Sequence, residues 1–275
     1  MIDNPIFILA CSPRSGSTWL QRVITSTEEV LIWGESTVLY PWGNLWTLDK
    51  GNDSKNPHDL FRFRERKAKM WMAVLNPFVS DLQKAHKRYM QELYGETALK
   101  EGYKRWGKKE TAFSEHTIQF LLSAWPKCKI IFLTRRFDAP FTSRFPQGKE
   151  GNFKAQAGTR ANDIKIWCEQ AISQHKVAYS IDSPQCRVVK YEDLVEDNYK
   201  VAKENNIKQL LDWLEIKATY NPIQIEQKIS CTNPDGERSY RLKRKDDIEA
   251  VAPYLKDILD ISSEIEYKLA GGWYE

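Results

Sequence analysis

A short loop rich in small and hydroxyl-bearing residues is the first feature of the chain that could do chemistry. Residues 12–18 read S-P-R-S-G-S-T, after an apolar run at residues 6–11 and before apolar positions at helical spacing. A strand, a glycine-containing turn and a helix start form an anion site, because unpaired backbone N–H groups and the helix dipole converge there. The segment therefore predicts a phosphate-binding loop.

The loop lacks the lysine that an ATP-binding loop needs. When Gly16 is placed on the second glycine of the Walker pattern G-x-x-x-x-G-K-[ST], Cys11 falls on the first glycine and Ser17 on the lysine. The cation that spans the β and γ phosphates is then missing, which argues against kinase or ATPase chemistry. An arginine inside the loop, Arg14, remains as its cation, with the Ser17 and Thr18 hydroxyls at the helix start.

The run P-R-S-G-S-T-W at residues 13–19 resembles the P-[KR]-S-G-[ST]-[ST] loop of the sulfotransferases that use 3'-phosphoadenosine 5'-phosphosulfate (PAPS). In that family the loop holds the 5'-phosphate. The resemblance implies PAPS as sulfuryl donor, PAP as product, and a three-layer, P-loop-like α/β fold with a central, mainly parallel sheet flanked by helices. It also implies these cofactor-binding residues: Arg14, Ser15, Gly16, Ser17, Thr18 and Trp19.

A second cationic segment, residues 129–144, resembles the family's site for the 3'-phosphate. In the family an arginine closes a central strand, and a serine eight positions later on the next helix joins it on that phosphate. Arg135 and Ser143 have this spacing. Arg136 stands where an aspartate is common and Asp138 where an arginine is frequent, so the sequence departs from the family between the two.

Two further segments are candidates for contacts to the rest of the nucleotide. Residues 187–194 resemble a family strand that ends in a Tyr-Glu corner, so Tyr191 is a candidate to contact the adenine, or is a structural tyrosine at a strand end. The family often closes over the 3'-phosphate with a basic loop near the C-terminus. Here the candidates from such a loop are Ser239, Arg241 and Lys243, and a solvated basic loop is the alternative.

Sulfuryl transfer to a hydroxyl needs a base, an in-line approach to sulfur and positive charge on the departing phosphate; no metal is required in principle. Glu35 is the candidate base, because it follows the short apolar run at residues 30–33 and should lie near the anion loop. Its G-E-S-T context resembles the tyrosylprotein and carbohydrate branches of the family, in which a glutamate is the base. The alternative is an exposed glutamate that caps a helix.

A lysine is the candidate to assist the departing phosphate. Residues 105–111, R-W-G-K-K-E-T, resemble the family's W-G-x-K-T segment, which places Lys109 first, although the adjacent Lys108 leaves the register open by one residue. Together with Arg14, Lys109 would stabilise charge on the leaving oxygen. His116 is the rival base, since cytosolic small-molecule sulfotransferases use a histidine after a comparable lysine; a lone structural histidine is the alternative.

The elements that must position these residues follow from the apolar pattern. Continuous apolar or β-branched runs at residues 6–11, 30–33, 129–134 and 187–191 alternate with helical stretches, which predicts a parallel sheet buried on both faces. Ligands of such sheets lie beyond the carboxyl ends of the strands. Residues 40–106, where aromatic and basic residues interleave, predict a helical insertion over the cleft, and glycines in residues 146–158 predict a loop nearby.

Composition limits the class of protein. The 275 residues, 41% of them hydrophobic, contain no apolar run long enough to span a membrane, and we expect one domain over residues 1–275. A net charge of +4 suits an anionic ligand and is mild for a nucleic-acid-binding protein. The five cysteines are scattered and contain no C-x-x-C pair, and no secretory leader is visible, so a cytoplasmic protein with free thiols is expected.

The acceptor is not specified by these patterns. A phenol, a sugar, a lipid alcohol or a peptide tyrosine would all fit a cleft under the insertion, with the aromatic content favouring an aromatic or hydrophobic acceptor. The alternatives to a sulfotransferase are a P-loop kinase, an inactive nucleotide-binding module, and a protein that binds RNA through residues 238–245.

Overall fold

The fold is built on a five-stranded, wholly parallel sheet with the strand order β2-β3-β1-β4-β5. The computed structural model describes residues 3–35, 79–145, 158–195, 200–222 and 245–264. The strands are β1 (Ile6–Ala10), β2 (Val30–Trp33), β3 (Arg105–Glu110), β4 (Lys129–Thr134) and β5 (Cys186–Lys190). β1 is central: Ile8 pairs with Lys109 of β3 on one side and with Ile131 of β4 on the other.

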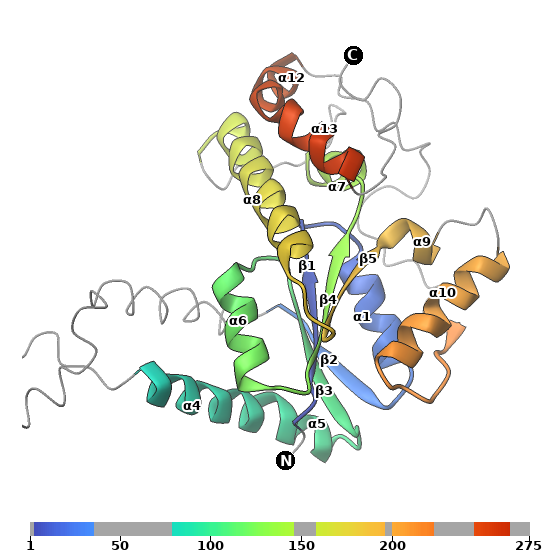
Figure 1. Cartoon of the computed structure of the whole chain (residues 1–275). Coiled ribbons are helices and arrows are strands. Elements are labelled where there is room, and N and C mark those ends of the chain that lie inside the picture. The colour runs from blue at the N-terminus through green and yellow to red at the C-terminus, as the bar shows by residue number, and fades with distance from the viewer. Residues whose placement is uncertain (1–2, 36–78, 146–157, 196–199, 223–244, 265–275) are drawn as a thin grey trace, which may run out of the picture.

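Side chains that alternate along each strand enter two separate cores, one on each face of the sheet. Ile6 and Ile8 of β1 pack on the core under α1 (Ser17–Thr25) and α10 (Lys200–Trp213). Phe7 and Leu9 pack on the opposite core, under α4 (Val79–Met90) and α6 (Glu115–Ala124). Figure 1 shows α1, α9 and α10 on one side of the sheet and α6 and α8 on the other. The result is the expected three-layer α/β arrangement.

The remaining helices extend this frame. A third core joins α7 (Asp138–Arg144) and α8 (Arg160–Ser180) to α12 (Lys245–Val251) and α13 (Leu255–Glu264), which are linked by the 3-10 turn η5 (Ala252–Tyr254). The short helix α9 (Tyr191–Val195) follows β5 directly. The π-helical η3 (Gln91–Glu96) and α5 (Thr97–Lys100) complete the elements before β3.

Four of the strands confirm the prediction from the sequence, within one residue at each end, and the fifth was missed. β3 was assigned to the end of a helical insertion over residues 40–106, but Arg105 and Trp106 belong to a buried strand between β2 and β1. Its sequence, R-W-G-K-K-E, has too many charges to indicate a buried strand. The predicted insertion otherwise falls largely on residues 36–78, and the predicted loop on residues 146–157, both outside the described residues.

The strand order predicts where a ligand would bind on this sheet. The chain passes from β1 through α1 to β2 on one side, and from β3 through α6 to β4 on the other side of β1. In open α/β sheets a ligand site forms where the strand order reverses, outside the carboxyl ends of the strands.

The helices in the described part of the chain include none with the length and hydropathy of a membrane span.

We expect a buried histidine to make the fold sensitive to acid. His175 of α8 is buried against Phe137, with the two ring centroids 4.8 Å apart. Burial lowers the pKa of His175 from 6.5 to about 4. The unfolded chain therefore binds an extra proton between these pH values, so stability falls as the pH drops through that window. Because of such a histidine, the free energy of unfolding of the protein falls by about 2 kcal/mol between pH 7.5 and pH 5.

Urea denaturation at pH 7.5 and pH 5 measures this effect. The variant His175→Gln should lose less stability on acidification than the wild type, although burial also lowers the pKa of His86 to about 4, so part of the acid sensitivity should remain. An unchanged difference between the two pH values in the variant would show that His175 is not the sensitive group.

Candidate active site at the carboxyl ends of the strands

The loop between β1 and α1 is shaped by two residues in the left-handed region. Arg14 has a φ of 70° and Gly16 a φ of 91°. Gly16 is the N-cap of α1 and offers no side-chain cap, and the first turn of α1 carries no acidic residue. The first N–H groups of α1 thus receive neither a capping side chain nor a carboxylate, which is the arrangement that binds an anion.

Two serine hydroxyls lie buried in the same loop. Ser12 and Ser15 are almost fully buried, and within the described part of the chain their Oγ atoms have no hydrogen-bond partner. Buried polar atoms normally have a partner, so unpaired hydroxyls at a helix start are a feature of a site for a polar ligand. Ser17 is also buried, whereas Thr18 is exposed.

Tyr191, the first residue of α9, is packed onto the loop. An ideal Cβ placed on Gly16 would lie 2.2 Å from the Tyr191 ring, so glycine is required here by space as well as by φ. The ring also meets Trp19 edge-on, with centroids 5.9 Å apart, and lies 4.4 Å from the Arg135 guanidinium carbon. Tyr191 therefore supports the shape of the loop, and its contact with the adenine stays a prediction.

Arg135, which follows β4, contacts the same loop. Its Nη1 donates to the Arg14 carbonyl at 3.1 Å, and its Nε lies 3.9 Å from Glu192 Oε1. Nε is buried and donates no hydrogen bond to the described residues. Ser143, the predicted partner of Arg135, lies exposed on α7. The structure thus brings Arg135 to the loop after β1, where it contacts Arg14 and Glu192.

Glu35 and Lys109 form the polar centre of the site. Lys109 Nζ lies 2.6 Å from Glu35 Oε1 and 3.4 Å from Thr18 Oγ1, so one ammonium joins the exit of β2 to the start of α1. The Lys109 side chain is 7% exposed and the Glu35 side chain 48% exposed. The Glu35 carboxylate is therefore held by the buried ammonium of Lys109 and remains accessible to solvent.

The register of the two lysines follows from the pleat of β3. Lys109 points to the face of α1, whereas Lys108 points to the opposite face and is fully buried there. Lys108 Nζ lies 3.0 Å from Glu110 Oε1, donates to the Gly34 carbonyl at 2.9 Å and sits 5.0 Å from the Tyr94 ring centroid. Lys109 is accordingly the lysine that meets the loop.

Of the remaining candidates, the structure describes His116. It lies half-buried in the first turn of α6, between Ser114 and Thr117, which form a capping box. The candidates Ser239, Arg241 and Lys243 fall outside the described residues. Glu192 is not among the site candidates from the sequence. It accepts a hydrogen bond from the Arg136 backbone and lies beside Arg135, and its place after the strand-end Tyr191 is the signal that could have found it.

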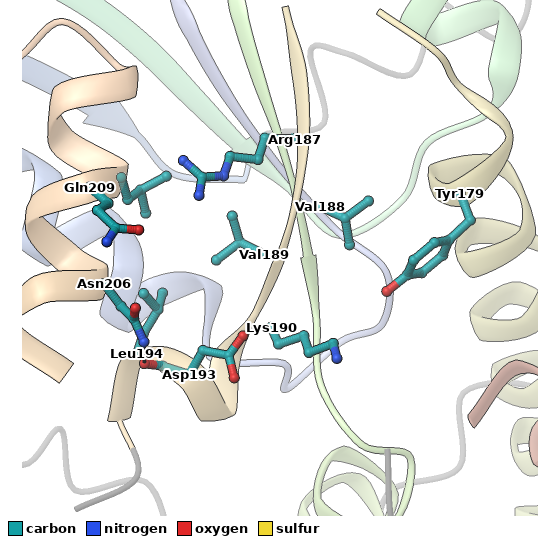
Figure 2. A pocket seen from close by; sticks show the side chains of 10 residues that line it. Tyr179, Arg187, Val188, Val189, Lys190, Asp193, Leu194, Asn206 and Gln209 are labelled. Carbon is teal, nitrogen blue, oxygen red and sulfur yellow. Dashed lines mark hydrogen bonds between the residues drawn. The ribbon is translucent and has the colours of Figure 1, made fainter. Parts of the chain in front are cut away.

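A pocket of about 290 Å³ lies beside β5, away from this centre. Its wall includes Val189 and Lys190 of β5, Tyr179 of α8 and Asn206 of α10 (Figure 2). Figure 2 shows Tyr179 on one side of β5 and Asn206 and Gln209 on the other. It shares no lining residue with the loop, with Glu35 or with Lys109, so it is a separate feature.

The contact between Gly16 and Tyr191 predicts a large effect of a single methyl group. The variant Gly16→Ala should unfold more easily, because it adds backbone strain and forces the Tyr191 ring, held by Trp19 and Arg135, to move. Strain at a positive φ costs about 1–3 kcal/mol, and overpacking costs a similar amount.

The matched control is Gly102→Ala, because Gly102 has a φ of 89° but nothing within 4 Å of its added Cβ. In urea denaturation the free energy of unfolding of Gly16→Ala should fall by at least about 1 kcal/mol more than that of the control. The control adds backbone strain alone. Equal losses would mean that the contact with Tyr191 does not constrain the loop.

Comparisons with known proteins identify the family of the chain. The chain matches the sulfotransferase family over residues 5–220. No curated protein sequence matches it. Similar solved structures include a sulfotransferase from Alicyclobacillus acidocaldarius, with 12% identity, 99% of each chain covered and a TM-score of 0.49. The sulfotransferase domain of the Synechococcus PCC 7002 olefin synthase has 16% identity, 97% of each chain covered and a TM-score of 0.49.

A further match is mouse sulfotransferase SULT7A1 complexed with PAP, with 15% identity, 82% of this chain and 62% of that chain covered, and a TM-score of 0.40. The family match spans most of the chain, from the residue before β1 to the segment after α10. The matched residues include the loop between β1 and α1, and also Glu35, Lys109, Arg135 and Tyr191. The chain belongs to the sulfotransferase family.

Proposed function

We propose that this protein transfers a sulfuryl group from PAPS to a hydroxyl group by in-line displacement, with Glu35 as the general base. The observation that carries the proposal is the contact of Lys109 Nζ with both Glu35 Oε1 and Thr18 Oγ1. It joins a solvent-accessible carboxylate, a buried cation and an anion-binding helix start in one network. A base, a charge for a leaving group and a phosphate site are the parts that sulfuryl transfer needs.

The residues around the loop fit a nucleotide with more than one phosphate group. The start of α1 has no side-chain cap, and Ser15 Oγ is buried without a partner in the described chain. Arg135 Nε is buried and donates no hydrogen bond to the described residues, and its ion pair with Glu192 is long, at 3.9 Å. These donors lie around the loop, where oxyanions would complete their hydrogen bonds. When bound, PAPS would supply a sulfuryl group on a phosphate leaving group.

Each side chain has a role in this proposal. The α1 N–H groups and the Ser17 and Thr18 hydroxyls would hold the 5'-phosphate, and Arg135 would offer its Nε to a second phosphate. Arg14 is exposed in the loop and Lys109 is buried beside Thr18 at the start of α1. Both cations would stabilise the negative charge that develops on the leaving oxygen. Well-aimed charges of this kind lower a barrier by about 3 kcal/mol per donor.

Glu35 is placed to take the proton of an acceptor. Almost half of its side chain is exposed, at 48%, so a hydroxyl can reach the carboxylate, and the ion pair with Lys109 holds one oxygen at 2.6 Å. The acceptor hydroxyl would donate its proton to Glu35 as its oxygen attacks. We propose a phenol, a sugar, a lipid alcohol or a peptide tyrosine as the acceptor, and the cytoplasm as the place of action.

Calorimetry with PAP tests the cofactor without knowledge of the acceptor. We expect PAP to bind more tightly than adenosine 5'-phosphate, and both to bind more tightly than ATP. Arg135→Ala should weaken PAP binding by about 10- to 100-fold, because a hydrogen bond to a charged group contributes about 1.5–3 kcal/mol.

The comparison of the two ligands separates two roles of Arg135, which also supports the loop through the Arg14 carbonyl. A role on the 3'-phosphate requires PAP to lose more affinity than adenosine 5'-phosphate, whereas equal losses would assign Arg135 to loop support alone. Lys176→Ala is the charge control, since Lys176 forms an exposed ion pair with Asp257. A preference for ATP, or the absence of nucleotide binding, would contradict the proposed cofactor.

Two isosteric variants decide between the candidate bases. Glu35→Gln should lower the rate of PAP release from PAPS, with 4-nitrophenol as acceptor, by at least about 100-fold, because general-base catalysis contributes about 10²–10⁴-fold. PAP affinity should not weaken, since Lys109 loses a competing partner. His116→Asn should stay within about threefold of wild type. The reverse pattern would make His116 the base and leave Glu35 a structural partner of Lys109.

A further inference from the structure

Lys108 is an unusual residue for the interior of a parallel sheet. Its side chain is completely buried, and its charge is met by Glu110 Oε1 at 3.0 Å, by the Gly34 carbonyl at 2.9 Å and by the face of Tyr94 at 5.0 Å. A buried ammonium is tolerated only when such partners replace the water it has lost. One of those partners, the Gly34 carbonyl, lies directly before the proposed base.

Gly34 lies where the β2–β3 ladder ends. It follows the last residue of β2, Trp33, which is the register partner of Lys108 in the β2–β3 ladder. Among the described residues, a Cβ added to Gly34 would meet only Gln21 Nε2, at 3.9 Å. Glycine is also the residue with the greatest backbone freedom. The hydrogen bond from Lys108 therefore restrains a residue whose backbone has large conformational freedom.

The anchor of Lys108 is itself rigid. Tyr94, whose ring lies over the ammonium, stacks on Trp106 with centroids 6.0 Å apart and accepts a hydrogen bond from Trp33 Nε1 at 3.1 Å through its carbonyl. The ammonium, the ring and the exit of β2 thus form one packed unit beneath the site.

From these contacts we propose that Lys108 is a positioning residue, which fixes the Gly34 carbonyl and thereby sets where the Glu35 carboxylate stands. Lys109 holds the Glu35 side chain from one face of β3, and Lys108 holds the backbone before it from the other face. This inference rests on the proposed function, because it assigns Lys108 a part in the action of Glu35 as base. Displacement of a reacting group by about 1 Å lowers a rate by about 100-fold.

The test is a double-mutant cycle between Lys108 and Glu35. The variant carries Lys108→Met together with Glu110→Gln, so that no carboxylate is left buried without its cation. It should release PAP from PAPS about 10- to 100-fold more slowly than the protein with Glu110→Gln alone, with PAP affinity within twofold. In the Glu35→Gln background the same change should have little further effect, because positioning matters only while the base is present.

Arg105→Met is the matched control. Arg105 is also a buried cation of β3 that donates to backbone carbonyls, of Asn4 at 3.0 Å and of Leu214, but it lies at the opposite end of the strand. Its loss should lower stability in urea denaturation while leaving the rate of the folded protein within about twofold. A Lys108 variant that slows the reaction equally with and without Glu35, or that does not slow it, would overturn the proposal.

A crystal structure of the Lys108→Met, Glu110→Gln variant separates failure of this proposal from failure of the proposed function. If the wild type neither binds PAP nor releases it from PAPS, the function is wrong, and the position of Glu35 then decides the inference alone. A shift or loss of order at Gly34 and Glu35 would support positioning by Lys108. An unchanged Glu35 to Lys109 contact would overturn it.

Discussion

Two neighbouring lysines on one buried strand are the constraint on which the site depends. Because side chains alternate along a strand, Lys108 and Lys109 leave opposite faces of β3, yet both contact the residues at which β2 ends. Lys108 donates to the backbone of Gly34, and Lys109 pairs with the side chain of Glu35. The exit of β2 is thus held from both sides of the sheet, although no ladder partner continues beyond Trp33. Without β3 between β2 and β1, the carboxylate and the anion loop would not share a cation.

The other half of the site is supported by the strands across β1. Arg135 after β4 donates to the Arg14 carbonyl, and Tyr191 after β5 fills the space that glycine leaves at position 16. The loop after β1 is therefore shaped by elements far along the chain and on the side of the sheet opposite to Glu35. Its two left-handed residues are costly in isolation, and these contacts explain how the loop keeps a conformation with its donors exposed to a ligand. β1 joins both halves because it lies at the centre of the sheet.

Much of the frame was predictable from local pattern, and the failure at β3 shows where such prediction ends. The strands β1, β2, β4 and β5 are apolar enough to be recognised one at a time, and the motifs also identified Arg14, Glu35 and Lys109. β3 was missed because burial of Lys108 and Lys109 depends on partners 74 residues earlier in the chain, at Gly34 and Glu35. A local pattern assigns charges to solvent. Here Lys109 is buried against the remote carboxylate of Glu35, and Lys108 pairs with the nearby Glu110 and donates to the remote Gly34 carbonyl. The contact of Arg135 with the Arg14 carbonyl, across 121 residues, was hidden for the same reason.

The cost of burying Lys108 indicates why a lysine stands there. Trp106 lies on the same face of β3 two residues earlier and fills the core with aromatic contacts to Phe7 and Trp125. An apolar residue at position 108 would extend that core, and replacing a buried ion pair by apolar side chains is often neutral or stabilising. Stability alone therefore does not account for the pair of Lys108 and Glu110. An apolar side chain, however, cannot donate to the Gly34 carbonyl, and that hydrogen bond links Lys108 to the backbone before the proposed base. The lysine is better explained by the geometry it imposes on Glu35 than by the energy it adds to the core.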